Sequence, residues 1–144
     1  MTDRPLEIRE GDWAVLGHEA TEIRRVVFIE EQCVPVEEEW DGRDSACRHF
    51  LAVQDGRPIG TARLLPDAHI GRVAVLAEAR GRGIGVALMR AAIEAARRDG
   101  HLRVELAAQT HALAFYERLG FEAVGGEFMD AGIAHRNMHL PLQE

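Results

Sequence analysis

A short segment rich in glycine and arginine, residues 80–85, constrains this chain more than any other feature. Its three glycines lie within five positions, after an apolar run at residues 73–76 and before a helical pattern that continues to about Arg98. Glycine permits positive φ and close approach of the backbone, and the start of a helix leaves N–H groups without intrahelical partners. These donors favour an anion such as phosphate or pyrophosphate. A plain turn between a strand and a helix is the alternative, but the strand–turn–helix context favours phosphate binding.

Two common nucleotide motifs do not fit this segment. A P-loop needs a lysine followed by serine or threonine after its last glycine, and here Gly85 is followed by Val86 and Ala87. A dinucleotide fingerprint needs a third glycine where Val86 stands, and it should open the domain. About seventy residues of mainly antiparallel pattern precede this segment instead.

Length and composition indicate one globular domain over residues 1–144, with 47% apolar and 28% charged residues. No apolar run reaches the roughly 20 residues that a bilayer span needs, and the first residues lack the apolar region of a signal peptide. We therefore expect a cytoplasmic protein without a membrane partner. Cys33 and Cys47 have no metal or redox spacing, so no metal site is predicted. The formal charge of −7 disfavours nucleic acid as a partner.

The hydrophobic pattern predicts a mixed α/β fold. We expect a strand at residues 6–9, a helix capped by Asp12, and an antiparallel meander over residues 47–76. The apolar stripe of that first helix comprises Leu16, Ala20, Ile23 and Val27. A helix from residue 84 and a strand at 102–108 predict a right-handed parallel crossover within one sheet. Thr110 is expected to cap a short helix at 111–119. A strand from residue 121, interrupted at 125–126, and a hairpin turning near 131–132 close the chain.

An acidic stretch between residues 30 and 44 surrounds Pro35, which should end any continuing helix. Such a stretch suits a solvated surface loop. It also suits the mobile wall of a substrate site, because its carboxylates would attract an amine. Both interpretations stay open on the sequence alone.

Three motifs in the expected order resemble the GNAT superfamily of N-acetyltransferases and its ElaA/YjcF-like branch. Arg80-x-x-Gly83-x-Gly85 matches the signature Q/R-x-x-G-x-G/A, and residues 113–121 (LAFYERLGF) are similar to the family's second hallmark. Residues 26–32 (VVFIEEQ), with Pro35 and the acids that follow it, resemble the ElaA/YjcF-like branch, as does the closing segment 132–138 (GIAHRNM). The resemblance covers nearly the whole chain.

The resemblance implies a GNAT-like mixed, twisted, mostly antiparallel sheet with helices on both faces, whose fourth and fifth strands splay apart. It also implies acetyl-CoA as co-substrate, with pantetheine in the splay and pyrophosphate on the glycine segment. The backbone of Val73, Ala74 and Val75 would then pair with the pantetheine arm. The cofactor-binding residues implied for the phosphates and for the polar side chain near the cofactor are Arg80, Gly81, Arg82, Gly83, Ile84, Gly85, Val86 and Gln109.

Acetyl transfer to an amine requires a base, an oxyanion donor and an acid, because a protonated alkylamine is not nucleophilic. Tyr116 occupies the position where the family commonly places the acid, although its helical spacing also suits a core aromatic. Glu39 and His135 are our candidates for the base, and family members often use a water chain instead. His49, alone in a strand, is more often a packed or an exposed side chain than a base.

Two functions remain at this stage. The first is an acetyl-CoA-dependent N-acetyltransferase that acts directly on a primary amine of a small molecule or peptide. The second is an acyl-CoA-binding sensor or interaction module with the same fold and little transferase activity. Pairing across a sheet edge would give a homodimer, which the sequence neither requires nor excludes.

Overall fold

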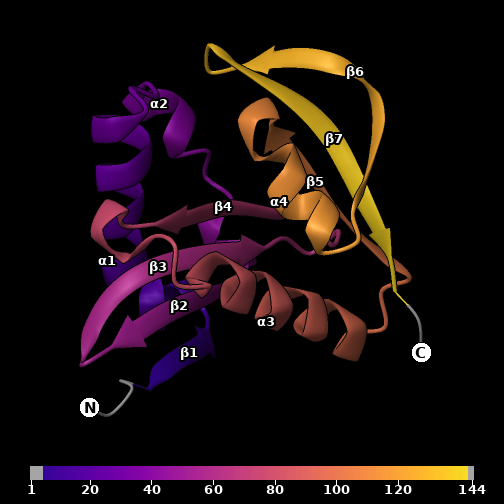
Figure 1. The fold of residues 1–144 in the computed structure, drawn as a ribbon. Coiled ribbons are helices and arrows are strands. Elements are labelled where there is room, and N and C mark those ends of the chain that lie inside the picture. Colours follow the sequence, from indigo (N-terminus) through magenta and orange to yellow (C-terminus); the bar gives the residue numbers. More distant parts are fainter. Residues whose placement is uncertain (1–4, 143–144) are drawn as a thin grey trace.

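The computed structural model describes residues 5–142. Two antiparallel sheets, joined by helices, make up the fold (Figure 1). The strands are β1 (Leu6–Gly11), β2 (Arg48–Gln54), β3 (Arg57–Leu64), β4 (Ile70–Val75), β5 (Arg103–Gln109), β6 (Glu122–Asp130) and β7 (Ile133–Pro141). The α-helices are α1 (Trp13–Arg24), α2 (Val36–Glu39), α3 (Ile84–Arg98) and α4 (Leu113–Arg118). A π-helix, Arg25–Glu31, continues α1, and single 3₁₀ turns lie at Asp44–Ala46, Ala77–Ala79 and Thr110–Ala112.

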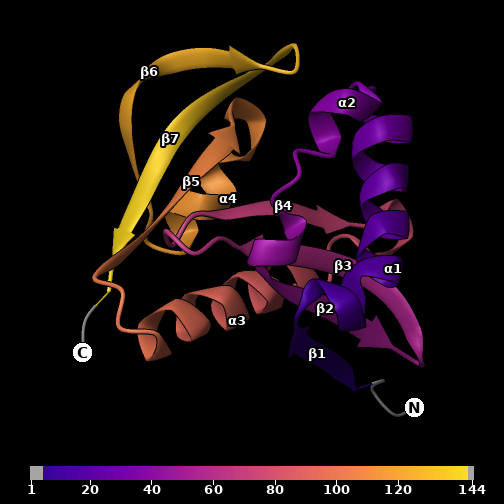
Figure 2. The same ribbon diagram turned by 180° about the vertical axis from the view of Figure 1, so that it is seen from behind.

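The first sheet, in the order β1-β2-β3-β4, is covered by a helix on each face. Helix α3 lies in front of it in Figure 1 and α1 in front of it in Figure 2, which is the view from behind. The alternation of side chains along a strand explains this: Phe50 and Ala52 belong to the core cluster of α3, whereas Leu51 and Val53 belong to that of α1. The predicted stripe of α1 is buried throughout, and the meander is antiparallel as expected.

The second sheet, in the order β5-β7-β6, diverges from the first at one end. Strands β4 and β5 run parallel but share only one isolated bridge, between His69 and Glu105, among the described residues. The crossover into a single continuous sheet, predicted from the hydrophobic pattern, is therefore wrong, and the splay that the family resemblance implied is confirmed. Beyond the bridge, the facing edges of β4 and β5 have no strand partner in the described chain.

Local sequence signals predict some of the element boundaries correctly and others wrongly. The Asp12 carboxylate accepts a hydrogen bond from the backbone N–H of Val15 at 3.1 Å, so the predicted cap of α1 is correct. Thr110 instead begins a 3₁₀ turn, and the N-cap of α4 is Ala112, which makes no side-chain capping bond. The glycines at 125–126 do not end β6. They lie in a register shift between Val124 and Phe128, consistent with a bulge in an exposed edge strand.

No helix among residues 5–142 is long and apolar enough to cross a membrane.

Candidate active site

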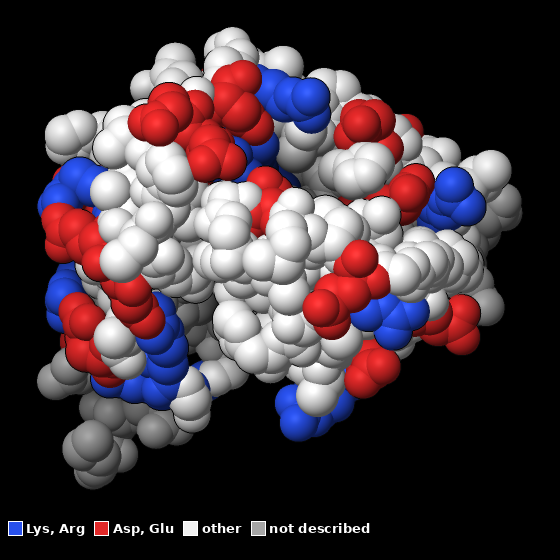
Figure 3. All heavy atoms as spheres, turned by 90° about the horizontal axis from the view of Figure 1, so that it is seen from above, with Lys and Arg blue, Asp and Glu red and all other residues white. Residues whose placement is uncertain are grey.

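A cavity of about 1340 Å³ opens where β4 and β5 separate. It is larger than the roughly 300–1,000 Å³ of an ordinary small-molecule site, so it has room for more than one ligand. Its lining includes the edge of β4, the glycine segment, the end of β5, helix α4, the π-helix and α2. Figure 3 looks down on this end of the molecule, where acidic side chains gather near basic atoms that lie in a recess.

The glycine segment has the backbone geometry that an anion site needs. Gly81 and Gly83 have φ of 80° and 79°, a region that disfavours other L-residues. A side chain at either position would enter open space on the cavity side rather than protein. Gly83 is the N-cap of α3, and the first helical hydrogen bond runs from Ala87 N–H to the Gly83 carbonyl. The N–H groups of residues 84–86 therefore have no intrahelical acceptor.

The two arginines of this segment differ in position. Arg80 lines the cavity, but its guanidinium is held by Glu31 through two 2.7 Å hydrogen bonds and by the Val75 carbonyl at 2.9 Å. Arg82 lies outside the lining and donates to Gln54 and to the Glu78 carbonyl. In this structure both arginines brace the segment, and its backbone is what faces the cavity.

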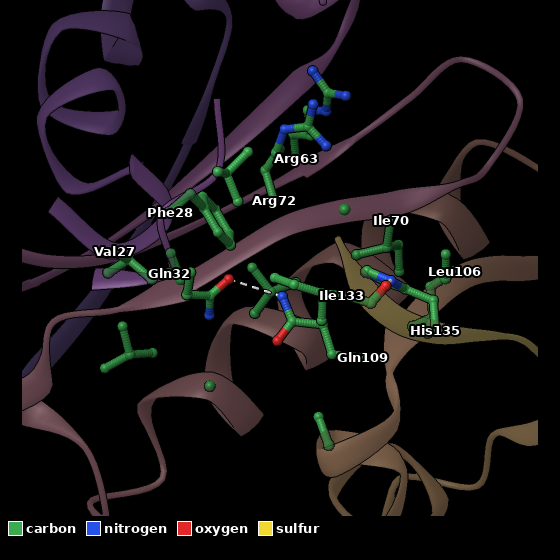
Figure 4. A pocket seen from close by; sticks show the side chains of 18 of the residues that line it. Val27, Phe28, Gln32, Arg63, Ile70, Arg72, Leu106, Gln109, Ile133 and His135 are labelled. Carbon is green, nitrogen blue, oxygen red and sulfur yellow. Dashed lines mark hydrogen bonds between the residues drawn. The ribbon is translucent and has the colours of Figure 1, made fainter. Parts of the chain in front are cut away.

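The open edge of β4 and the end of β5 form the two sides of the cavity. Val73, Ala74 and Val75, the residues predicted to pair with pantetheine, all line it. Gln109 lies opposite and donates from Nε2 to the Oε1 of Gln32, at the end of the π-helix, at 2.9 Å. Figure 4 shows these two side chains pointing toward each other across the cavity. Gln109 was predicted to lie near the cofactor, whereas no site role was predicted for Gln32.

Tyr116 lines the same cavity from α4. Its ring packs edge-on against Phe115 and Phe121, with centroids 5.0 and 6.1 Å away. Burial raises the pKa of Tyr116 to about 12, so the phenol stays protonated at neutral pH. Within residues 5–142 its hydroxyl has no hydrogen-bond partner, yet it is not among the enclosed unpaired atoms. The hydroxyl is therefore available to a ligand in the cavity.

The two candidate bases lie in very different surroundings. His135 on β7 lies opposite Gln109 of β5, and its ring stacks on Phe128. Its Nδ1 lies 2.7 Å from the Ile133 carbonyl oxygen. Because a carbonyl can only accept, Nδ1 carries a hydrogen and donates it. Its Nε2 is thus the atom with a free lone pair in the neutral ring. Glu39, only 3% exposed, also lines the cavity, but its carboxylate is hydrogen-bonded by Arg24 at 2.8 Å.

A buried ion network occupies the acidic end of the cavity. Arg24 donates to Glu39 and, at 2.7 Å, to Asp44, which also accepts from Arg63 at 3.0 Å. Arg63 continues to Asp41 at 2.6 Å, and this bond holds the pKa of Asp41 well below its usual range. With Arg72, which lies 3.2 Å from Glu39, the ion network has three arginines and three carboxylates. Three of the seven acids in the predicted amine-attracting wall are thus paired with arginines inside the protein.

The sequence analysis missed all three of these arginines. Arg24, Arg63 and Arg72 come from α1, β3 and β4, and each carries a charge at a buried or half-buried position of its element. A charged residue at an apolar position of the pattern is a signal that could have found Arg24 and Arg63. His49 is buried against Trp13 and bonds the Asp44 carbonyl at 2.8 Å, outside the cavity lining, which agrees with a packed side chain.

The open edge of β4 and the glycine-rich start of α3 therefore line one cavity at the point where β4 and β5 separate. Residues 18–142 match the acetyltransferase (GNAT) domain family, so the chain belongs to the GNAT superfamily and is an N-acetyltransferase. This family uses acyl-CoA donors, and the predicted fold and enzyme class are confirmed.

Individual relatives support the same family and its branch. The chain is 36% identical to the N-acetyltransferase YjcF of Bacillus subtilis over 81% of this chain and 86% of that protein. Among solved structures, an acyl-CoA N-acyltransferase from Pseudomonas aeruginosa is 34% identical, with a TM-score of 0.84 over 94% of this chain and 99% of that one. Escherichia coli ElaA is 28% identical, with a TM-score of 0.83 over the same shares. The resemblance to the ElaA/YjcF-like branch is confirmed.

Proposed function

We propose that this protein transfers an acetyl group from acetyl-CoA directly to a primary amine of a small molecule or peptide. The observation that carries the proposal is the convergence of three features on one cavity: the glycine segment, the open edge of β4 and the hydroxyl of Tyr116. The glycine segment would bind phosphate, the edge of β4 would bind an extended chain, and the Tyr116 hydroxyl would act as the acid.

The cofactor would be held mainly by backbone. The free N–H groups of residues 84–86 and the open space above Gly81 and Gly83 suit a pyrophosphate. The edge of Val73, Ala74 and Val75 would pair with pantetheine as an added strand does. An N–H of the same edge would stabilise the oxyanion. When bound, acetyl-CoA supplies an activated acyl carbon and a thiolate leaving group.

The chemistry then needs a base and an acid from the chain. His135 would accept a proton from the ammonium at Nε2, since its Nδ1–H is fixed on the Ile133 carbonyl. The new C–N bond replaces the C–S bond, and Tyr116 would return a proton to the departing sulfur. Glu39 is the weaker candidate for the base, because its carboxylate already pairs with Arg24 and Arg72.

Direct transfer is favoured over an acyl-enzyme. Neither cysteine belongs to the cavity lining. Cys33 is exposed elsewhere, and burial raises the pKa of the Cys47 thiol, whose sulfur donates to the Arg43 carbonyl. A thiol with a raised pKa is a poor nucleophile at neutral pH.

The test is a panel of amines and peptides with acetyl-CoA, read by release of CoA thiol and by mass of the N-acetyl product. We expect release that depends on the amine and exceeds hydrolysis in its absence, with acetyl-CoA preferred to longer acyl-CoA donors. Tight acetyl-CoA binding without amine-dependent release over the whole panel would favour the acyl-CoA-binding module instead.

A further inference from the structure

Arg72 is a charged side chain of the cavity to which acetyl transfer assigns no role. It lies on β4 directly before the predicted cofactor edge, and its side chain is 25% exposed. Its φ is 50°, at the point where the pairing of β4 with β3 loses its regular register. A non-glycine residue at positive φ is strained, and such strain concentrates at functional sites. A strained, half-buried guanidinium in the wall of a substrate cavity needs an explanation.

The hydrogen bonds of Arg72 leave part of its guanidinium unused. Nη2 donates to the carbonyls of Glu39 and Glu38 at 3.1 and 3.3 Å and to Oδ2 of Asp41 at 3.4 Å. Nε lies 3.2 Å from the Glu39 carboxylate but is an enclosed atom without a hydrogen bond. Nη1 has no hydrogen-bond acceptor among residues 5–142, although it is not enclosed. Nη1 of Arg72 is therefore open to donate a charge-assisted hydrogen bond to a carboxylate.

Arg72 shares both of its carboxylate partners with other arginines. Glu39 also pairs with Arg24, and Asp41 also pairs with Arg63. Burial lowers the pKa of the Arg72 guanidinium more than its neighbours raise it, which means that its charge is poorly solvated. An anion entering the cavity would relieve this.

Negative charge suited to an amine remains at the rim. Glu37 and Glu38 on α2 line the cavity, are exposed, and have no ion pair among the described residues. The same end of the cavity thus offers the open Nη1 of Arg72 in its interior and the unpaired carboxylates of Glu37 and Glu38 at its rim. Figure 4 shows Arg63 and Arg72 close together, on the far side of Phe28 from the bridge between Gln32 and Gln109.

We infer that Arg72 binds a carboxylate of the acceptor, so that the acceptor is a zwitterion such as an α-amino acid rather than a simple alkylamine. This rests on the proposed function and adds the class of substrate. The amine would lie toward the edge of β4, where transfer occurs, with the carboxylate on Nη1 of Arg72. The carboxylates of α2 would attract the ammonium group before it binds.

Arg72 could instead serve only to hold α2 through the carbonyls of Glu38 and Glu39. The two roles separate when substrates differ in the carboxylate alone. For several side chains, an α-amino acid, its amide and its decarboxylated amine are compared with wild type and with Arg72→Gln. Arg90→Gln, an exposed residue of α3 outside the cavity lining, is the matched control.

Wild type should use the amino acid at least about tenfold better in kcat/KM than its amide or decarboxylated amine, as expected for a charged hydrogen bond. Arg72→Gln should abolish this preference, so that kcat/KM falls at least about tenfold more for the amino acid than for the decarboxylated amine, and Arg72→Lys should retain part of the preference. Equal losses for all three substrates would assign Arg72 to structure and overturn the inference, as would a wild type indifferent to the carboxylate.

Calorimetric titration of the amino acids separates this inference from the proposed function, because it needs no turnover. Binding that weakens about tenfold in Arg72→Gln but not in Arg90→Gln supports the carboxylate site even if thiol is never released, and then only the transferase proposal fails. Efficient acetylation of amines without regard to the carboxylate would leave the transferase in place and remove the inference. Thermal unfolding of each variant confirms that it is folded.

Discussion

The two walls of the cavity are built on opposite principles. The predicted cofactor wall, residues 73–75 and 80–86, lies within 14 consecutive positions, presents backbone groups and carries no buried charge. The acceptor wall consists of α2 and the ion network of Arg24, Glu39, Asp41, Asp44, Arg63 and Arg72, whose members lie up to 48 positions apart in the chain. A cofactor shared by a whole family can be bound by backbone groups, whatever the side chains are. An acceptor that differs from one member to the next must be recognised by side chains.

Their energetics differ in the same way. Backbone donors at a helix start are fixed by the helix itself, so the cofactor wall should tolerate side-chain changes except where a Cβ would enter the anion site. A buried ion network stabilises the fold only while every charge keeps a partner. Removing one member should therefore destabilise the other members of the acceptor wall. The predictions below test this contrast, from the largest expected effect to the smallest.

Removing the central arginine of the ion network should have the largest effect. Arg24 is 1% exposed, pairs with Glu39 and Asp44, and lies between the rings of Trp13 and Trp40 at 5.7 and 4.9 Å. Arg24→Ala leaves two buried carboxylates short of a partner and should lower the free energy of unfolding by about 3–5 kcal/mol. Urea unfolding measures this loss.

The neighbouring arginine is a natural control for that experiment. Arg25 is 42% exposed and pairs with Glu22 and Glu30 at the surface. Arg25→Ala should cost less than about 1 kcal/mol. Equal losses in the two variants would show that the ion network contributes no more than a surface pair, and the contrast between the walls would fail.

Gly83→Val tests the cofactor wall at the position where backbone geometry matters most. The new side chain would enter the open space proposed for pyrophosphate, at a φ of 79°. We expect acetyl-CoA affinity to fall roughly 30-fold, about 2 kcal/mol. Gly100→Val is the matched control, because Gly100 follows α3 with a φ of 86°, also faces open space, and lies outside the cavity lining. Similar affinity losses in both variants would mean that backbone strain, and not an anion site, explains the result.

The backbone geometry of the glycine segment could be predicted from the sequence because its signals are local. Glycines between a strand and a helix define their own backbone geometry, and the alternating and helical patterns placed β2, β3, α1 and α3 correctly. The separation of β4 from β5 could not be derived from the same patterns. Both strands are apolar and the connection is a legitimate crossover, so only the resemblance to a family indicated that they diverge.

The acceptor wall could not be predicted in this way, because its structure depends on contacts between positions far apart in the chain. Its acidic stretch is conspicuous, and the sequence allowed either a solvated loop or an amine site. The choice depends on Arg24, Arg63 and Arg72, whose proximity arises from packing α1 on one face of the sheet. No spacing rule relates such distant positions. For this reason Glu39 was named as a base although its carboxylate is buried in an ion network.

Tyr116→Phe tests the catalytic group that links the two walls. The phenylalanine ring can keep the contacts with Phe115 and Phe121, so only the hydroxyl is lost. We expect turnover to fall at least about tenfold at unchanged acetyl-CoA affinity, a loss of roughly 1.4 kcal/mol of transition-state stabilisation. Steady-state rates on a verified amine and a separate binding measurement check both parts. Unchanged turnover would remove Tyr116 from the role of acid and return it to the core.

The smallest expected effect is on the pH dependence of stability, and it belongs to the acceptor wall alone. Hydrogen bonds from Arg63 hold the pKa of Asp41 below its usual value, so the folded state keeps this carboxylate ionised where the unfolded chain takes up a proton. Asp41 therefore stabilises the protein above about pH 4, its pKa when unfolded, and this contribution is lost as the pH falls. Asp41→Asn should be less stable than wild type by about 1 kcal/mol at pH 7, with the difference shrinking toward pH 3. Urea unfolding across this range measures both curves, and parallel curves would show that Asp41 gains nothing from Arg63.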